Sequence, residues 1–207
     1  MQGSLIQKII RLKKSSTSRL AKKRMKEFQS IRKKGINAIF KELCFCILTA
    51  NFSAEGGIRI QKAIGDGFLT MGEKELAKAL RSNGYRFPNT RALYIAKARE
   101  KMPELKKALS MEPKELRYWL IKNIYGLGYK EASHFLRNIG FNDFAIIDFH
   151  IVDLLVSEGL IRKPRSITPK KYLKIENKLK EIAKEVGLTL GELDLYLWYL
   201  STGKILK

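Results

Sequence analysis

The chain has 207 residues, 45% of them hydrophobic, which is enough for the core of a compact domain and excludes a disordered or fibrous protein. Forty-one Lys and Arg residues oppose 20 Asp and Glu residues, and the net charge of +21 indicates a polyanionic partner, with nucleic acid favoured over an anionic membrane surface. The longest apolar run, near Leu43 to Ala50, is too short to span a bilayer, and the start of the chain lacks a secretory pattern, so we expect an intracellular protein.

The first 34 residues carry about half of the excess charge. They hold twelve basic residues and one acid, Glu27, and so contribute +11 to the total of +21. Apolar residues recur at helical spacing on both sides of Ser15 and Ser16, which predicts two short amphipathic helices separated by a serine-rich turn. The segment is either a solvated basic face or a surface that contacts phosphates, and the sequence leaves both open.

Helical spacing dominates from Ile36 onward. Glycines fall where helices should stop, and prolines fall near their expected starts. The predicted helices cover residues 36–49, 54–64, 73–82, 90–101, 102–109, 113–124, 130–139, 148–158, 169–186 and 189–202. We therefore predict an all-α protein, a compact helical array in two lobes with a cleft between them.

Two cysteines and two histidines limit the metal chemistry of the chain. Cys44 and Cys46 lie two apart on one predicted helix, where their side chains point to different faces and cannot bridge each other. Four-cysteine zinc sites and four-cysteine iron–sulfur clusters need more thiolates than the chain has. We expect no disulfide framework and no cluster of this kind.

The most informative stretch is the turn Gly126-Leu127-Gly128 between two predicted helices. Two glycines let the backbone turn sharply and approach another chain closely, while Leu127 can enter the core between the helices. Such a turn presents the free amides at the start of the second helix, where the helix dipole favours a DNA phosphate. A turn of this type can be only a tight connector, but the charge of +21 favours the DNA interpretation.

A lysine and an aspartate follow this turn. Lys130 lies in the first turn of the second helix, where the dipole and the basic surroundings disfavour its charged form and so favour a nucleophilic amine. Asp148 follows an apolar run and directly precedes another predicted helix. Asp148 is therefore either a structural N-cap or a partly buried carboxylate that takes part in chemistry.

These residues carry a resemblance. Gly126-Leu-Gly128-Tyr-Lys130, followed by Asp148-Phe-His150, resembles the helix-hairpin-helix plus Gly/Pro-Asp motif of base-excision DNA glycosylases, over about residues 116–155. Ile146 and Ile147 stand where that motif usually has Gly or Pro before the aspartate. The segment from Gly191 to Lys207, together with the absence of a β-domain, is similar to the archaeal-type subfamily of 8-oxoguanine DNA glycosylases.

The resemblance implies a bifunctional glycosylase and AP lyase. Lys130 would attack C1′ of the damaged nucleoside and form a Schiff base, and the 3′-phosphate would then be eliminated. Asp148 would stabilise the positively charged transition state, and His150 would contact a phosphate. No metal or cofactor is needed for these steps, although the family's hairpin often holds a monovalent cation.

The same resemblance implies residues that read the base. Asp194 and Trp198 lie four apart in an apolar helical segment and would present a carboxylate and a stacking indole together. The alternative is that Trp198 is core and that Asp194 caps a helix or pairs with Lys174 or Lys178. In the archaeal-type subfamily a terminal lysine closes over the flipped base, which assigns Lys207 to the pocket.

The glycosylase resemblance also assigns residues to the space that the flipped nucleotide leaves. Tyr85 would wedge into the duplex, Arg86 would read the opposite cytosine, and Asn51 would fill the vacated position. Ordinary packing of the Asn83–Phe87 loop is the alternative for Tyr85 and Arg86.

The combined prediction is one glycosylase unit over residues 1–207, acting on double-stranded DNA that contains 8-oxoguanine. We expect one lobe to contain residues 36–112 and 116–155, with the helix-hairpin-helix at 116–139, and a second lobe to contain residues 1–35 and 156–207. We expect a monomer in a prokaryotic cytoplasm, with no membrane partner. Two alternatives remain: the same chemistry on an oxidised pyrimidine, and a helix-hairpin-helix module that binds DNA without cutting it.

Overall fold

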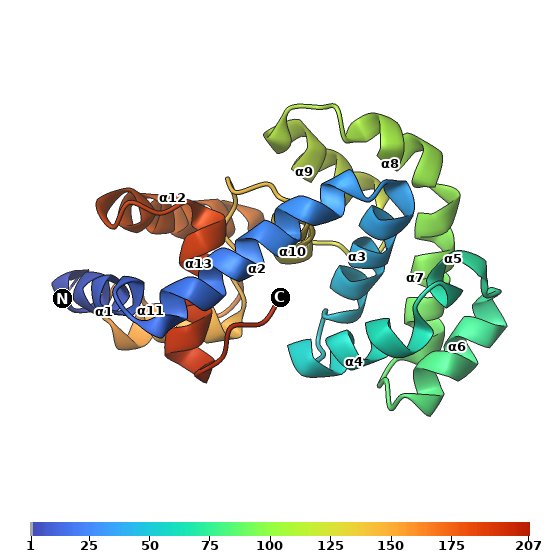
Figure 1. The fold of residues 1–207 in the computed structure, drawn as a ribbon, viewed down its shortest axis with the longest axis horizontal. Helices are drawn as coiled ribbons and strands as arrows, with labels where there is room; N and C mark the ends of the chain where they lie inside the picture. The colour runs from blue at the N-terminus through green and yellow to red at the C-terminus, as the bar shows by residue number, and fades with distance from the viewer. Residues whose placement is uncertain (1) are drawn as a thin grey trace.

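The computed structural model describes residues 2–207, and within this range the chain is helical with no strand, which confirms the all-α prediction. The helices are α1 (Gln2–Lys13), α2 (Ser16–Lys33), α3 (Ile36–Leu48), α4 (Ala54–Ile64), α5 (Gly67–Thr70), α6 (Glu73–Ser82), α7 (Pro88–Glu100), α8 (Met102–Ala108), α9 (Pro113–Asn123), α10 (Tyr129–Asn138), α11 (Phe149–Ser157), α12 (Pro169–Glu185) and α13 (Leu190–Thr202). Figure 1 shows α4 to α8 gathered on one side and α1, α11, α12 and α13 on the other.

Side-chain N-caps start five of the helices: α2, α4, α11, α12 and α13. The Ser15 side chain accepts from the Thr17 amide at 3.2 Å and starts α2, and the Thr189 hydroxyl accepts from the Glu192 amide at 3.2 Å and starts α13. Two elements differ from the sequence prediction. The short helix α5 was not predicted, and α2 has 18 residues instead of being a short helix.

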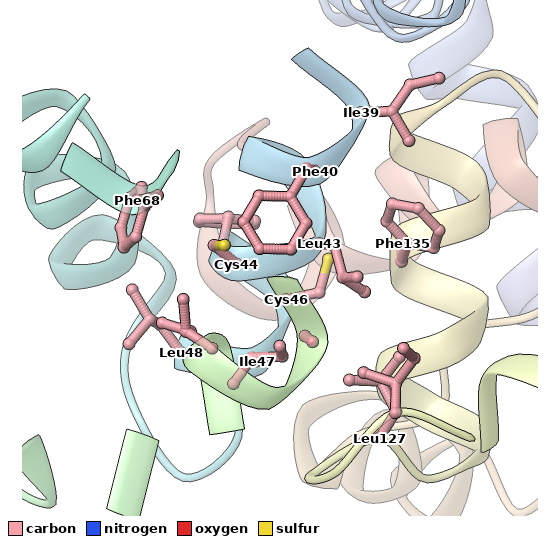
Figure 2. Close-up of a cluster of buried hydrophobic side chains, with 14 of the residues drawn as sticks. Ile39, Phe40, Leu43, Cys44, Cys46, Ile47, Leu48, Phe68, Leu127 and Phe135 are labelled. Atoms are coloured by element: carbon pink, nitrogen blue, oxygen red, sulfur yellow. The ribbon is translucent and has the colours of Figure 1, made fainter. Parts of the chain in front are cut away.

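The larger hydrophobic core surrounds α3. This helix is apolar on nearly every face because α2, α4, α7, α8 and α10 all pack against it. Figure 2 shows Phe40, Leu43 and Ile47 of α3 between Phe68 on one side and Phe135 of α10 on the other. The two cysteines of α3 are free and buried in this core, and burial raises the pKa of both thiols.

A second core joins α1, α11, α12 and α13. Leu5, Ile6 and Ile9 of α1 belong to it, and its other residues begin at Ala145, whereas the first core ends at Phe144. The lobe boundary predicted near residue 155 therefore differs from the boundary between the cores, because α11 packs on α13 and belongs with the second lobe. A third, smaller cluster packs Phe28 of α2 near Tyr196 of α13, so the long helix α2 crosses from one lobe to the other (Figure 1).

No helix in residues 2–207 is long and apolar enough to cross a membrane.

Phe135 is the side chain whose removal we expect to damage the larger core most clearly, since it is fully buried between α10 and α3. Phe135→Ala should lower the free energy of unfolding by about 3–5 kcal/mol because it leaves a cavity. Chemical denaturation measures this change. Phe149→Ala is the matched control, because Phe149 is 67% exposed, and its effect should stay within about 0.5 kcal/mol. Equal effects of the two substitutions would contradict this description of the core.

Candidate active site

A cavity of about 950 Å³ lies between the two lobes. Its walls come from the end of α3 and the start of α4, from the first turns of α10 and α11, and from α13. The structure brings eight of the eleven residues predicted for the site to its lining: Asn51, Gly128, Lys130, Asp148, His150, Asp194, Trp198 and Lys207. Gly126, Tyr85 and Arg86 are the three predicted residues outside that lining.

The hairpin turn uses its two glycines differently. Gly126 has φ +83°, and a Cβ atom there would lie 2.7 Å from Cδ2 of Tyr94, so both conformation and space require glycine. Gly128 precedes α10, and its amide donates to Oε2 of Glu131 at 3.1 Å. Leu127 between them is buried in the larger core, as the sequence indicated. The turn thus holds the start of α10 at the cavity wall.

Lys130 is the second residue of α10, and its side chain is 21% exposed. Its ammonium lies 3.4 Å from the Thr49 carbonyl at the end of α3 and 3.6 Å from Oε1 of Glu131. From the sequence, the positive end of α10 and the basic surroundings were the expected influences on this amine. The structure adds a carbonyl and a carboxylate that hold the amine in the cavity of the free protein.

Asp148 has a position that fits both of the roles that the sequence left open. It is the N-cap of α11, where its Oδ1 accepts from the Ile151 amide at 3.0 Å, and it also lines the cavity. His150 is two residues further on, and its ring meets the indole of Trp198 edge-on, with ring centroids 4.8 Å apart. One helix start therefore presents a carboxylate and an imidazole to the same space.

Asp194 is buried in an ion pair with Arg137 of α10. The predicted alternatives Lys174 and Lys178 are not its partner, because the carboxylate faces α10 across the lobe boundary. Burial raises the pKa of Asp194 to about 6, and the Coulombic attraction of Arg137 opposes that rise. The carboxylate is therefore mostly ionised at neutral pH but titrates close to it.

Two aromatic rings near Asp194 have polar atoms without a protein partner. Trp198 lines the cavity, and within the described chain its buried Nε1 makes no hydrogen bond. Nδ1 of His134 is also buried and also makes no hydrogen bond within the described chain. Burial lowers the pKa of His134 well below its ordinary value. His134 is therefore neutral in the free protein, and both rings leave hydrogen-bonding capacity at the cavity.

Lys207 reaches across to the other lobe. Its ammonium lies 2.7 Å from Oε1 and 3.0 Å from Oε2 of Glu42, also contacts the side-chain oxygen of Gln61, and lies 4.4 Å from the centroid of the Phe45 ring. Glu42 is itself buried and accepts from the Asn138 amide group at 3.2 Å. Helices α3 and α4 thus form a complete binding site for this one lysine, which fixes the last residues of the sequence at the cavity.

The loop from Asn83 to Phe87 corrects one assignment. Tyr85, predicted to wedge into the duplex, is 4% exposed, and its hydroxyl donates to the Leu48 carbonyl at 2.6 Å. It is a packing residue, because burial of its ring and hydroxyl ties the loop to the end of α3. Phe87 is the exposed aromatic of this loop, and Arg86 beside it is exposed, as its predicted role requires.

Asn51 is three residues beyond the end of α3 and has a left-handed conformation, with φ +62°. It is the only non-glycine residue with positive φ in the part of the chain that the structure describes. Asparagine tolerates this conformation better than most residues. The turn places Asn51 at the cavity, next to Phe52, which also lines it.

Sequence reasoning missed Glu42, Arg137 and His134. A signal was present for Glu42, because a lone acid inside the apolar helix 36–48 needs a buried partner. Arg137 and His134 lie on the buried side of α10, where helical spacing places them with Phe135 and Leu136 but does not name their partners. In residues 2–207 no three His, Cys, Asp or Glu side chains gather as a metal site would require.

Comparison with known proteins agrees with this geometry. The 8-oxoguanine DNA glycosylase family matches residues 21–188. A protein of Korarchaeum cryptofilum named 8-oxoguanine DNA glycosylase/AP lyase is 51% identical over 206 residues, which are 98% of each chain. A Methanocaldococcus jannaschii protein of the same name is 52% identical over 98% of this chain and 99% of its own.

Solved structures give the same result. The Methanocaldococcus jannaschii 8-oxoguanine glycosylase/lyase in complex with a 15mer DNA containing 8-oxoguanine superimposes with a TM-score of 0.96, covering 99% of this chain and all of the other. The 8-oxoguanine DNA glycosylase of Thermotoga maritima, 42% identical over the full length of both chains, gives 0.94. The hairpin, the cavity and these similarities together show that the chain belongs to the 8-oxoguanine DNA glycosylase family.

Proposed function

We propose that this protein excises 8-oxoguanine from double-stranded DNA and then nicks the strand by β-elimination, as its family membership indicates. The observation that carries the proposal is that a single cavity holds an amine, a carboxylate and an indole, on Lys130, Asp148 and Trp198. The cavity is large enough for a flipped nucleotide, which a glycosylase must take out of the duplex to reach C1′.

The chemistry begins at the amine. Nζ of Lys130, as the neutral amine, forms a bond to C1′ as the C1′–N9 bond breaks, and the base leaves with that electron pair and takes up the proton that Nζ gives up. The sugar ring then opens to a Schiff base, a proton is lost from C2′, and the 3′-phosphate leaves. Asp148 stays ionised and stabilises the positive charge on the sugar in the first step. In this scheme Lys130 is the nucleophile and Asp148 the stabilising charge, and neither step calls for a cofactor.

Base recognition falls to α13 and the last residues of the sequence. The indole of Trp198 stacks on the base, and the Asp194 carboxylate accepts from its Watson–Crick edge. Guanine and 8-oxoguanine differ at C8 and at N7, where the lesion carries a proton that guanine lacks. The segment that Lys207 anchors provides an acceptor for that proton, which attracts the lesion and repels guanine.

The remaining predicted residues bind DNA around the cavity. The free amides at the start of α10, after Gly128, bind a phosphate, as does His150, and the same hairpin is the place for a monovalent cation. Asn51 fills the space that the nucleotide leaves, and Arg86 reads the opposite base. We expect a monomer that works on the chromosome in a prokaryotic cytoplasm.

The two alternatives are weaker. A module that only binds DNA needs the hairpin amides but no lysine in a cavity of this size, so Lys130 argues against it. An oxidised pyrimidine would use the same lysine and aspartate, but a smaller base fills less of a cavity that Trp198 and Phe52 line. The names of the relatives also favour 8-oxoguanine.

Replacing the proposed nucleophile tests the chemistry. Lys130→Gln should abolish both base release and strand nicking on a duplex with one 8-oxoguanine, because an amide cannot form the Schiff base, while affinity for that duplex remains. Product analysis on gels and a binding titration measure the two properties. A duplex with one oxidised pyrimidine serves as the substrate control. Strand nicking by the variant would contradict the assignment.

The pH dependence of lesion binding tests Asp194. Its carboxyl is protonated below about pH 6 and ionised above it, and only the ionised form is a pure acceptor. In the Lys130→Gln background, affinity for 8-oxoguanine DNA relative to abasic-site DNA should therefore fall as the pH drops through about 6. Asp194→Asn should remove that change. A pH-independent ratio in the protein with Asp194 intact would exclude this role.

Glu42→Gln tests the anchor of Lys207. Loss of a buried charge-assisted contact loosens the end of the chain, so the preference for 8-oxoguanine over guanine should fall by about tenfold, while cleavage at an abasic site stays nearly unchanged. Glu55→Gln is the matched control, because Glu55 pairs with Lys204 of the same segment in an exposed contact of 2.8 Å. If Glu42→Gln left the preference for 8-oxoguanine over guanine unchanged, the contact of Lys207 with Glu42 would be structural and would take no part in base recognition.

A further inference from the structure

The segment that carries Asp148 has no helical hydrogen bonds of its own. Residues 144–148 run without helix between α10 and α11, yet Ala145 and Ile147 are almost fully buried. Buried backbone groups must find partners outside the segment. In this protein α12 supplies them.

Two side chains of α12 bind the backbone of this segment. The Tyr172 hydroxyl donates to the Ala145 carbonyl at 2.7 Å and accepts from the Ile147 amide at 3.2 Å. Oε2 of Glu176 accepts from the Ala145 amide at 3.0 Å. Burial raises the pKa of Tyr172, so its hydroxyl keeps the proton that it donates. Together these bonds fix the backbone that ends at Asp148.

The same two side chains are bound to the hairpin. Arg117 of α9 donates to both carboxylate oxygens of Glu176, at 2.6 and 2.9 Å, and to Oγ of Ser133 in α10 at 3.3 Å. Oγ of Ser133 also lies 3.5 Å from the Tyr172 hydroxyl. Arg117, Ser133, Tyr172 and Glu176 are all buried. This cluster therefore joins both helices of the hairpin, α12 and the segment before Asp148.

We propose that Tyr172 and Glu176 are positioning residues for the glycosylase reaction, which set the Asp148 carboxylate relative to Lys130 on the hairpin. The proposal rests on the roles given to Lys130 and Asp148 above. Ser133 is three residues after Lys130 on α10, and Ile147 directly precedes Asp148. The Tyr172 hydroxyl contacts both Ser133 and Ile147, and so connects the backbone that carries Lys130 to the backbone that carries Asp148. Tyr172 itself lines the cavity wall.

The energetics of the cluster favour a geometric role. A buried ion pair loses most of its Coulombic gain to desolvation, so it contributes little net stability compared with apolar residues of the same size. What it does supply is a defined arrangement, because bidentate pairing of Arg117 with Glu176 allows few alternatives. Reactive groups need such definition, since a misplacement of about 1 Å can cost about a hundredfold in rate.

Tyr172→Phe is the direct test, because it deletes one oxygen and keeps the ring. In the full-length protein, the single-turnover rate of 8-oxoguanine release should fall by about ten- to a hundredfold. The dissociation constant for lesion DNA should change little. The melting temperature should fall by a few degrees, because the Ala145 carbonyl and the Ile147 amide lose their hydroxyl partner, but the variant should stay folded at the assay temperature. Glu176→Gln should slow release in the same way, and if that variant does not fold, Tyr172→Phe decides alone.

Tyr196→Phe is the matched control, since Tyr196 is equally buried but lies in the cluster between α2 and α13. Its release rate should equal that of the unmodified protein. The positioning role would be overturned if Tyr172→Phe released the base at an unchanged rate. It would also be overturned if the variant bound DNA more weakly and melted at a lower temperature, but the bound enzyme still reacted at an unchanged rate. Asp148→Asn separates the two claims: full activity in that variant would instead overturn the proposed function of Asp148.

Discussion

A charge buried without a partner costs several kcal/mol, and this constraint shapes the protein around its cavity. Arg137 in the hairpin helix α10 pairs with Asp194 of α13. Arg117 of α9 pairs with Glu176 of α12 at 2.6 Å. Each pair joins an element of the larger lobe to an element of the second lobe, so neither lobe can satisfy its buried charges alone. The cavity forms where the two sets of partners meet.

The residues proposed for base recognition and those proposed for catalysis lie on different elements. Asp194, Trp198 and Lys207 belong to α13 and the segment after it, whereas Lys130 and Asp148 begin α10 and α11. With the roles proposed above, the base and the sugar of one nucleotide would thus meet different elements. This division allows the base-reading elements to discriminate the lesion while the amine and carboxylate act on a sugar that is the same in every nucleotide.

The sequence predicted features that depend on neighbours along the chain. The hairpin glycines, the N-cap at Asp148 and nearly all helix ends follow from local rules of conformation and capping, and the structure has them as expected. Lys130 could be singled out because its position at a helix start is itself a local property. The family resemblance added Trp198 and Lys207, which local rules would have left as core and tail.

Features that depend on long-range partners could not be predicted. Helical spacing shows that Asp194 and Arg137 each lie on a buried face, but not that the two meet across 57 residues of sequence. An aromatic in a loop can point in or out, and Tyr85 points in because the Leu48 carbonyl at the end of α3 needs a donor. The predicted lobe boundary differs from the boundary between the cores for the same reason. The spacing of apolar residues in α11 shows that the helix has a buried face, but not that this face packs on α13.

The central claim is that one particular amine of the cavity forms the covalent intermediate. Lys130 and Lys207 both line that cavity, and the whole sequence has 41 Lys and Arg residues. Borohydride reduction of the reacting complex with 8-oxoguanine DNA, followed by proteolysis and mass spectrometry, locates the lysine that carries the sugar. The account predicts the adduct on the peptide that contains Lys130 and on no other. An adduct on Lys207 or on another lysine would contradict it.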